Sequence, residues 1–279
     1  MNLNRRIRRR TTALLAIAAL GLAIAPAAAS ASSTITISGA TASYPLVSLL
    51  AQKYAKLAKG AVKFKIAQGG AQVGINDVAT GRVSVADVSR DPLPTDPKGL
   101  VFYPIAKYGI CVVTNRANTL SNLTGSQLTS IFTGKTRNWS QVPGASASGT
   151  IDLISRTSVA GVLTSFQTLL LEGRKVSEPL GQERSSEGLL RAAVESDPNA
   201  IGFLSNYQAA LGSKLNTVGF NGVACNRSTI VSGQYAGVAR FYEVTKGAAT
   251  NGPVASFINW ISKSTAARKI ISSQWVPIT

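Results

Sequence analysis

Segments with a two-residue period and segments with a helical period alternate along the first part of the chain. Polar and apolar residues alternate over 34–37, and apolar residues then recur at helical spacing over 46–57. The succession continues with an alternating segment at 62–67, a helical segment at 71–79 and an apolar segment at 83–88. Strands that alternate with helices are typical of an α/β fold with a largely parallel sheet, so the pattern predicts that class.

The same two periods predict a second series of elements in the rest of the chain. The segment 109–113 is apolar enough to be a buried strand. Thr124 and Gln127 have the spacing of a capping box that opens a helix. The predicted strands cover 101–105, 108–114, 151–154 and 200–204, with two more within 228–244, and the predicted helices cover 124–132, 162–171, 185–194, 253–261 and 265–274.

The first 31 residues have the composition of an export signal. Five arginines precede residue 11, and the apolar segment 13–24 is too short to span a bilayer with ease. Residues 29–31 fit a cleavage site, with 27–29 as the alternative. We therefore expect residues 1–31 to be a cleaved signal peptide. No cysteine stands directly after the apolar segment, which leads us to expect no lipid anchor.

The charge of the chain narrows the range of its partners. The chain has 29 Lys and Arg residues against 12 Asp and Glu, and an excess remains without the first 31 residues. Such an excess attracts anions, although it also suits a polyanionic surface or solubility at low pH. Basic residues form no run after residue 31 and do not alternate with aromatic residues, so no nucleic-acid partner is expected.

Residues that enzymes and metal sites use are scarce. There is no histidine, which is the commonest general base, and no serine-hydrolase motif, and the carboxylates are scattered. Cys111 and Cys225 in an exported chain predict a disulfide, worth about 4–5 kcal/mol. Two thiols without histidine cannot complete a tetrahedral metal site. We therefore predict no catalytic residue, no metal and no cofactor.

A loop of small residues at 38–46 is the first candidate binding element. It lies between a predicted strand and a predicted helix, and Pro45 suits the first helical position. The N-terminus of a helix offers free N–H groups and a positive dipole, and Thr41 and Ser43 add hydroxyl groups. The loop therefore suits an anion. The alternative is an ordinary turn, in which the hydroxyl groups only cap the helix.

Eight segments carry motifs that occur together, in this order, in one protein family. They are 38–46 (SGATASYPL), 69–75 (GGAQVGI), 86–93 (ADVSRDPL), 123–140 (LTGSQLTSIFTGKTRNWS), 154–156 (ISR), 199–205 (NAIGFLS), 232–235 (SGQY) and 240–242 (RFY). By these motifs the chain resembles the phosphate-binding periplasmic proteins of ABC importers (PstS-like solute-binding proteins) along nearly its whole length after residue 31. The segment 123–140 is highly specific.

The resemblance implies a two-lobe periplasmic-binding-protein-like fold (type II). Each lobe would have a central mixed sheet flanked by helices, and two hinge strands would join the lobes. On this chain, residues 32–114 and 219–279 would form one lobe and 115–218 the other, with an anion between them. Cys111 and Cys225 flank the expected crossings, so their disulfide would fasten the base of the hinge.

The resemblance also implies the positions of the binding residues. Ser43 and Tyr44 match donors of the first loop, and Arg156 matches an arginine that pairs with the anion. Arg90 lies where some members carry an acid that accepts a ligand proton and others carry arginine; a salt bridge is the alternative role. The candidate residues are Thr41, Ser43, Tyr44, Ala71, Gln72, Arg90, Arg156, Ala160, Gly161 and Val162.

Three candidate positions depart from the family pattern. Ala71, Ala160 and Val162 stand where the family has hydroxyl side chains. Each hydrogen bond lost to a buried charged ligand costs about 1.5–3 kcal/mol. Backbone N–H groups remain at these positions, and polar neighbours such as Gln72 can substitute.

These observations lead to one predicted function and one alternative. We predict a periplasmic or secreted, monomeric solute-binding protein for inorganic phosphate or a similar tetrahedral oxyanion, which it delivers to the membrane permease of an ABC importer. The alternative is a diverged member that acts as an extracellular scaffold or sensor with weak or no anion binding. A secreted phosphatase is a third hypothesis, with no catalytic set to support it.

Overall fold

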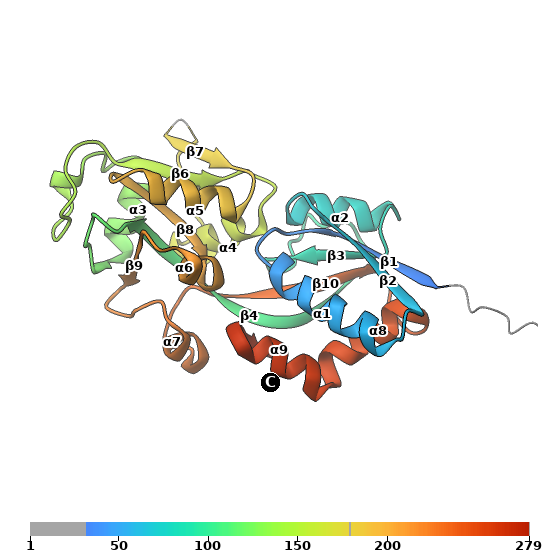
Figure 1. The fold of residues 1–279 in the computed structure, drawn as a ribbon. Helices are drawn as coiled ribbons and strands as arrows, with labels where there is room; N and C mark the ends of the chain where they lie inside the picture. The colour runs from blue at the N-terminus through green and yellow to red at the C-terminus, as the bar shows by residue number, and fades with distance from the viewer. Residues whose placement is uncertain (1–31, 179, 279) are drawn as a thin grey trace, which may run out of the picture. The chain divides into compact units, whose positions relative to one another are not determined.

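Helices and strands alternate through residues 32–178 and 180–278, the part of the chain that this computed structural model describes (Figure 1). The predicted signal peptide lies outside the described residues. None of the helices within them has the length and apolar character needed to cross a membrane. The elements are β1 (Ser33–Gly39), α1 (Tyr44–Leu57), β2 (Val62–Gln68), α2 (Ala71–Ala79), β3 (Val85–Val88), β4 (Leu100–Asn115), β5 (Asn122–Leu123), α3 (Gly125–Phe132), η1 (Trp139–Gln141), β6 (Asp152–Arg156), α4 (Gly161–Leu170), β7 (Gly181–Arg184), α5 (Glu187–Ser196), β8 (Ala200–Ser205), α6 (Asn206–Leu211), β9 (Leu215–Phe220), α7 (Arg227–Ser232), β10 (Val238–Lys246), α8 (Gly252–Lys263), α9 (Thr265–Gln274) and β11 (Val276–Pro277).

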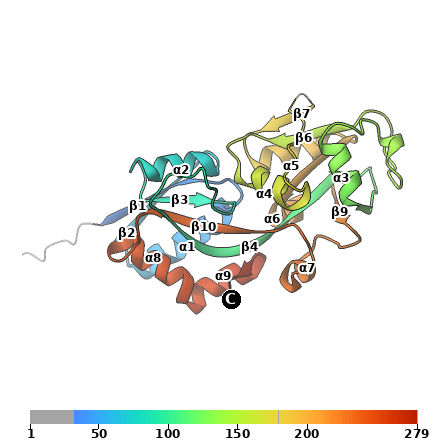
Figure 2. The same cartoon turned by 180° about the vertical axis from the view of Figure 1, so that it is seen from behind.

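The first part of the sheet has the strand order β2-β1-β3-β10-β4. β1 is parallel to β2 and to β3, whereas β10 runs antiparallel to β3 and β4, so the sheet is mixed. Both views show α2 on one face and α1, α8 and α9 on the other (Figures 1 and 2). Ile35 and Ile37 of β1 are buried in the core with Leu46 and Leu50 of α1. Each such side chain contributes about 1.5–3 kcal/mol by leaving water. The predicted α/β class is confirmed.

β4 belongs to both parts of the sheet. Its first residues pair with β10 and β11, and its last residues pair with β8 and β9. β8 then pairs with β6, and β6 with β7. The sequence predicted two strands, at 101–105 and 108–114, but β4 is continuous. The expected break is wrong because Ala106 and Lys107 are held by β10 on one edge and by β11 on the other.

A second prediction is wrong between residues 228 and 244, where two strands were expected. Residues 227–232 form α7, and only β10 is a strand. The Asn226 side chain accepts a hydrogen bond from the Thr229 N–H and so caps α7. Gly233 ends the helix with a positive φ of 75°, which glycine adopts without strain. Strong local capping outweighs the β-branched residues of this segment.

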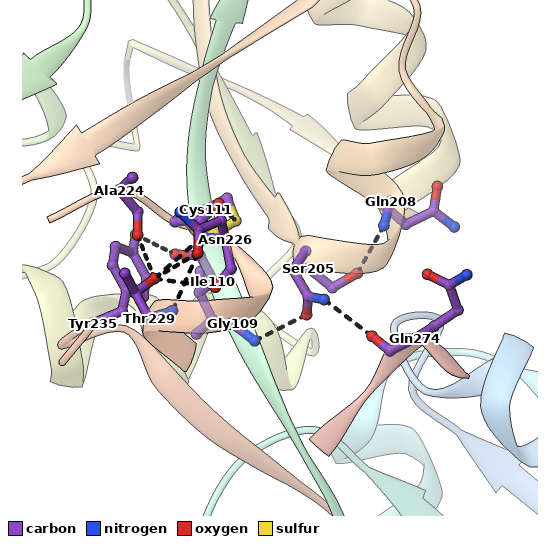
Figure 3. Close-up of a disulfide and its surroundings, with 12 residues drawn as sticks. Gly109, Ile110, Cys111, Ser205, Gln208, Ala224, Asn226, Thr229, Tyr235 and Gln274 are labelled. Carbon is purple, nitrogen blue, oxygen red and sulfur yellow. Dashed lines mark hydrogen bonds between the residues drawn. A yellow bond between two sulfur atoms is a disulfide. The ribbon is translucent and has the colours of Figure 1, made fainter. Parts of the chain in front are cut away.

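The predicted disulfide between Cys111 and Cys225 is confirmed. Their Cα atoms lie 5.5 Å apart, although 114 positions separate them in the sequence. Cys111 lies in β4 opposite Leu204 of β8. Beside it, the Tyr235 hydroxyl donates to the Ile110 carbonyl at 2.8 Å (Figure 3). The bond and its neighbours therefore fasten the chain between β9 and β10 to the middle of β4.

Candidate anion-binding site

Three helices begin at one small cavity. Its walls are the loop before α1, the first residues of α2 and α4, and the ends of β3 and β6; the lining residues are Ala40, Thr41, Ala42, Gly70, Ala71, Ser89, Arg156, Ala160, Gly161 and Val162. In this structure the walls lie so close together that no water molecule fits between them. An ion can therefore enter only when the surrounding loops move apart.

The three helices at the cavity lack side-chain caps. The N-cap residues are Ser43 for α1, Gly70 for α2 and Ala160 for α4, and none accepts a hydrogen bond from the helix through its side chain. Side-chain oxygens do cap α3, α5, α6, α7 and α9, so among the described helices only α8 shares this lack. N-termini without side-chain caps leave N–H donors and positive dipole ends for an anion, although in α2 the Gln72 N–H donates to the Val159 carbonyl.

Arg156 supplies the positive charge of the cavity. It ends β6, and only 1% of its surface is exposed. Nε donates to the Arg184 carbonyl at 2.9 Å, and Nη2 donates to the Ser185 carbonyl at 2.9 Å and to Thr41 Oγ1 at 3.1 Å. Nη1 is buried and has no acceptor among the described residues. A buried charged donor without an acceptor is costly, so this group suits an anionic ligand.

A second buried charge, Glu187, lies near Arg156. It starts α5 and accepts hydrogen bonds from the Ser205 N–H and hydroxyl, both at 2.6 Å. Burial lowers the pKa of Arg156, and the negative charge of Glu187 opposes that effect. Burial likewise raises the pKa of Glu187, and Arg156 opposes it. Arginine nevertheless stays protonated in proteins, so the cavity keeps its positive charge.

Small residues let the two parts of the sheet meet across the cavity. The Gln72 N–H, at the start of α2, donates to the Val159 carbonyl, before α4, at 3.0 Å. A Cβ atom on Gly161 would lie 2.7 Å from Ser89 Oγ and 2.8 Å from the Ala71 Cβ. No side chain larger than hydrogen fits there. The cavity is therefore closed by the loops that surround it.

The structure brings together six of the predicted site residues: Thr41, Ala71, Arg156, Ala160, Gly161 and Val162 all line the cavity. Ser43, Tyr44, Gln72 and Arg90 do not. The Ser43 hydroxyl instead donates to the Asp87 carboxylate. Tyr44 is half-buried at the first position of α1.

Arg90 has other partners. Its Nη2 donates to Asp96 Oδ1 at 2.6 Å and to the Gln72 side chain at 3.1 Å, and its Nη1 donates to Asp96 Oδ2 at 2.9 Å. Both side chains of this ion pair are buried. The neighbouring Asp91 faces away, because it accepts from the Tyr242 hydroxyl and its side chain is 61% exposed. The salt bridge named as the alternative role of Arg90 is therefore present.

Sequence reasoning missed four lining residues: Ala40, Ala42, Gly70 and Ser89. Ser89 follows β3, and polar residues at the carboxyl ends of strands gather at binding sites in α/β folds. That position was a signal for Ser89, and it also lies within the motif at 86–93. Ala40 and Ala42 lie in the loop 38–46 and Gly70 in the motif 69–75, but no polar side chain singled them out, and the course of the backbone brings them to the cavity.

The arrangement favours anion binding over other chemistry. The lining residues supply one guanidinium, hydroxyl groups and helix N-termini, and they include no carboxylate. Within 32–178 and 180–278, no three His, Cys, Asp or Glu side chains are grouped as a metal would require. Donors that converge with a cation bind an oxyanion without reacting with it.

Comparisons with known proteins agree with this geometry. A family model described as the PBP superfamily domain matches residues 25–264. The phosphate-binding protein PstS of Bacillus subtilis (strain 168) is 27% identical over 247 residues, which cover 87% of this chain and 80% of the relative. The predicted resemblance is therefore confirmed.

Solved structures show the same fold. One structure, with bound phosphate, is of a protein from Clostridium perfringens that is described as a phosphate ABC transporter substrate-binding protein. Its TM-score is 0.80 at 25% identity, and the match covers 88% of this chain and 100% of that chain. An ABC-type phosphate transport receptor from Vibrio cholerae has a TM-score of 0.72 at 25% identity, over 88% of this chain and 100% of that chain. The named relative is thus a phosphate-binding protein, and the two structures are of proteins described as parts of phosphate ABC transport.

Proposed function

Since the chain belongs to the PBP superfamily domain family, we propose that it is an extracytoplasmic solute-binding protein for inorganic phosphate or a similar tetrahedral oxyanion. One observation carries the proposal. Arg156 Nη1 is buried without an acceptor among the described residues, and Arg156 lines a cavity at which three uncapped helices begin. The names of the relatives supply the identity of the ion, phosphate.

Binding would act by closure of two lobes. We assign residues 32–114 and 219–279 to one lobe and 115–218 to the other. The pairing of β4 supports this assignment, since its first residues pair with β10 and its last residues with β8 and β9. The hydrogen bond between Arg156 and Thr41 joins the two groups of loops at the cavity. An anion between them would add contacts that exist only in the closed form, and so would shift the balance toward it.

The closed form would then deliver its ion to the membrane permease of an ABC importer. The transport context of the relatives supports this partner. The predicted signal peptide supports a periplasmic or secreted site of action, and we expect a monomer. A role in binding, without turnover, fits a cavity that no carboxylate lines.

A second candidate function rests on the side chains that are missing from the cavity. Ala71, Ala160 and Val162 line it without a hydroxyl group. Three lost hydrogen bonds to a charged ligand, at about 1.5–3 kcal/mol each, would weaken a micromolar complex to millimolar or beyond. A diverged scaffold or sensor would keep the fold and lose the ion.

Calorimetric titration of residues 32–279 with phosphate, sulfate, molybdate and tungstate tests both candidates. We expect binding of at least one ion, together with a higher Tm in its presence. Arg156→Ala should abolish both, whereas the matched change of an exposed arginine, Arg174→Ala, should alter neither. A folded protein that binds none of the four ions at millimolar concentration contradicts the proposal and supports the scaffold or sensor.

A further inference from the structure

Two buried carboxyl groups lie opposite each other behind the anion cavity. Asp87 of β3 and Glu243 of β10 are directly paired in the antiparallel register. Their exposed fractions are 2% and 0%. Both Glu243 carboxyl oxygens lack a hydrogen-bond partner among the described residues. Opposite residues in such a pair have Cβ atoms roughly 4.5–5.5 Å apart, so two negative charges here would repel strongly.

No cation of the neighbouring elements contacts this pair within the described part of the chain. α1 contributes only the Ser43 hydroxyl, and β1 has no titratable residue. Charged and titratable groups of the other elements bond elsewhere or are exposed. Asp77 of α2 bonds to Ser38 and Arg82, and Arg90, which follows β3, pairs with Asp96. Tyr242 and Arg240 of β10 contact Asp91, Tyr103 of β4 bonds to Ala249, and Lys263 of α8 lies in solvent. The pair is therefore stable only while it holds protons.

Asp87 also holds the loop that forms one wall of the cavity. Its backbone carbonyl accepts from the Ala40 N–H at 2.8 Å, and its carboxyl group accepts from the Ser43 hydroxyl. The lining residues between these two anchors are 40–42. Because the Ser43 hydroxyl bonds to Asp87, it does not cap α1. Asp87 thus keeps the loop in place and the N-terminus of α1 open.

We propose that Asp87 is a positioning residue for the anion cavity and that, with Glu243, it supports anion binding only while the pair is protonated. This inference rests on the proposed function. When the pair loses a proton, a negative charge appears beside Ser43. That charge attracts the positive end of α1 and repels a bound anion, so anion affinity falls.

The direction of the titration agrees with this arrangement. Burial raises the pKa of Asp87 to about 8, and the Ser43 hydrogen bond opposes the rise. Burial and then the charge of Asp87 raise the pKa of Glu243 well above its ordinary value. A carboxyl group with a raised pKa stabilises the fold below its unfolded-state pKa and loses that contribution as pH rises through the folded-state pKa. The loss for Asp87 therefore runs from about pH 4 to about pH 8.

Phosphate affinity, measured from pH 6 to 10, tests the proposal in the wild type, Asp87→Asn and Asp87→Ala. Asparagine keeps an acceptor for Ser43 but cannot ionise. Phosphate itself ionises in the same way in both titrations, so the ratio of wild-type to Asp87→Asn affinity reports only the ionisation of the protein. We expect this ratio to fall about tenfold between pH 7 and 10, within the usual range of couplings between sites. Asp87→Ala should bind more weakly than Asp87→Asn at pH 7. Asp152→Asn, in the other part of the sheet, should follow the wild type.

Urea unfolding of the ligand-free variants gives a second, independent measurement. Asp87→Asn should reduce the wild type's loss of stability between pH 4 and 8 and leave the parts of it that Glu243 and Glu187 contribute. Ser43→Ala leaves the Asp87 carboxyl group in place, so this variant should keep the loss of stability at high pH. It removes the hydrogen bond between Asp87 and the loop, so the ionisation of Asp87 should then change phosphate affinity less. A pH-independent affinity ratio overturns this inference alone. Absence of phosphate binding at every pH overturns the proposed function as well.

Discussion

Arg90 and Arg156 are both buried, and both follow or end a strand near the anion cavity, yet their roles differ. Arg90 meets Asp96 through two hydrogen bonds, at 2.6 and 2.9 Å, and its charge is neutralised locally. Arg156 bonds to carbonyls and a hydroxyl, and its Nη1 has no acceptor among the described residues. A buried arginine with its own carboxylate supports the fold, whereas one without a carboxylate in contact is available to a ligand.

The largest expected effect concerns Arg90. Arg90→Ala leaves Asp96 buried without its partner, and breaking a buried pair in this way costs about 3–5 kcal/mol of stability. Urea unfolding measures the loss. The control is Arg82→Ala, which breaks an ion pair whose arginine side chain is 64% exposed, and it should cost no more than about 1 kcal/mol. Equal losses of stability in the two variants would show that the buried Arg90–Asp96 pair stabilises the fold no more than an exposed pair does.

The next effect concerns Arg156 and should appear in binding. Arg156→Ala removes a charged donor from the cavity, and we expect at least about a hundredfold loss of oxyanion affinity. Arg156→Lys keeps the charge but loses the planar fork of donors, so an intermediate loss is expected. Calorimetry measures both. If both variants are folded and Arg90→Ala weakens oxyanion binding more than Arg156→Ala, Arg90 and not Arg156 is the residue that serves the ligand.

A smaller effect, on pH dependence, tests the acid beside Arg156. Burial raises the pKa of Glu187, so its contribution to stability is present at low pH and is lost as pH rises through the folded-state pKa. Each unit of such a shift is worth about 1.4 kcal/mol. Glu187→Gln should therefore reduce the decrease in unfolding free energy between pH 4 and 8. An unchanged pH slope would show that Arg156 offsets the burial of Glu187 completely.

The smallest effect should come from restoring a hydroxyl group to the cavity wall. Val162→Thr is close to isosteric at a buried lining position. One added hydrogen bond to a charged ligand should raise affinity about tenfold, the lower end of the range for such a bond, while the ligand-free protein loses about 1 kcal/mol through an unpaired hydroxyl. Titration and unfolding of the same sample measure both. The exposed Val231 offers the matched control, since Val231→Thr lies away from the cavity and should change neither value.

The sequence predicted most of the elements and the loops that meet at the cavity. The motifs at 38–46, 69–75 and 154–156 place Thr41, Ala71 and Arg156 together, as the structure does. The sequence could not predict which arginine is neutralised, because Asp96 reaches Arg90 only after the chain turns back beyond β3. It also missed α7, where the Asn226 cap decides the local structure.

Amino-acid order alone determined the α/β class, the disulfide and the type of binding element, because hydrophobic period, cysteine count and loop composition are local properties. Only the tertiary structure decided which N–H groups stay uncapped, which charges are paired and that Asp87 lies opposite Glu243. Those properties depend on distances between residues far apart in the chain, and burial sets their energies. A charge that water would screen at the surface becomes decisive once the fold excludes water from it.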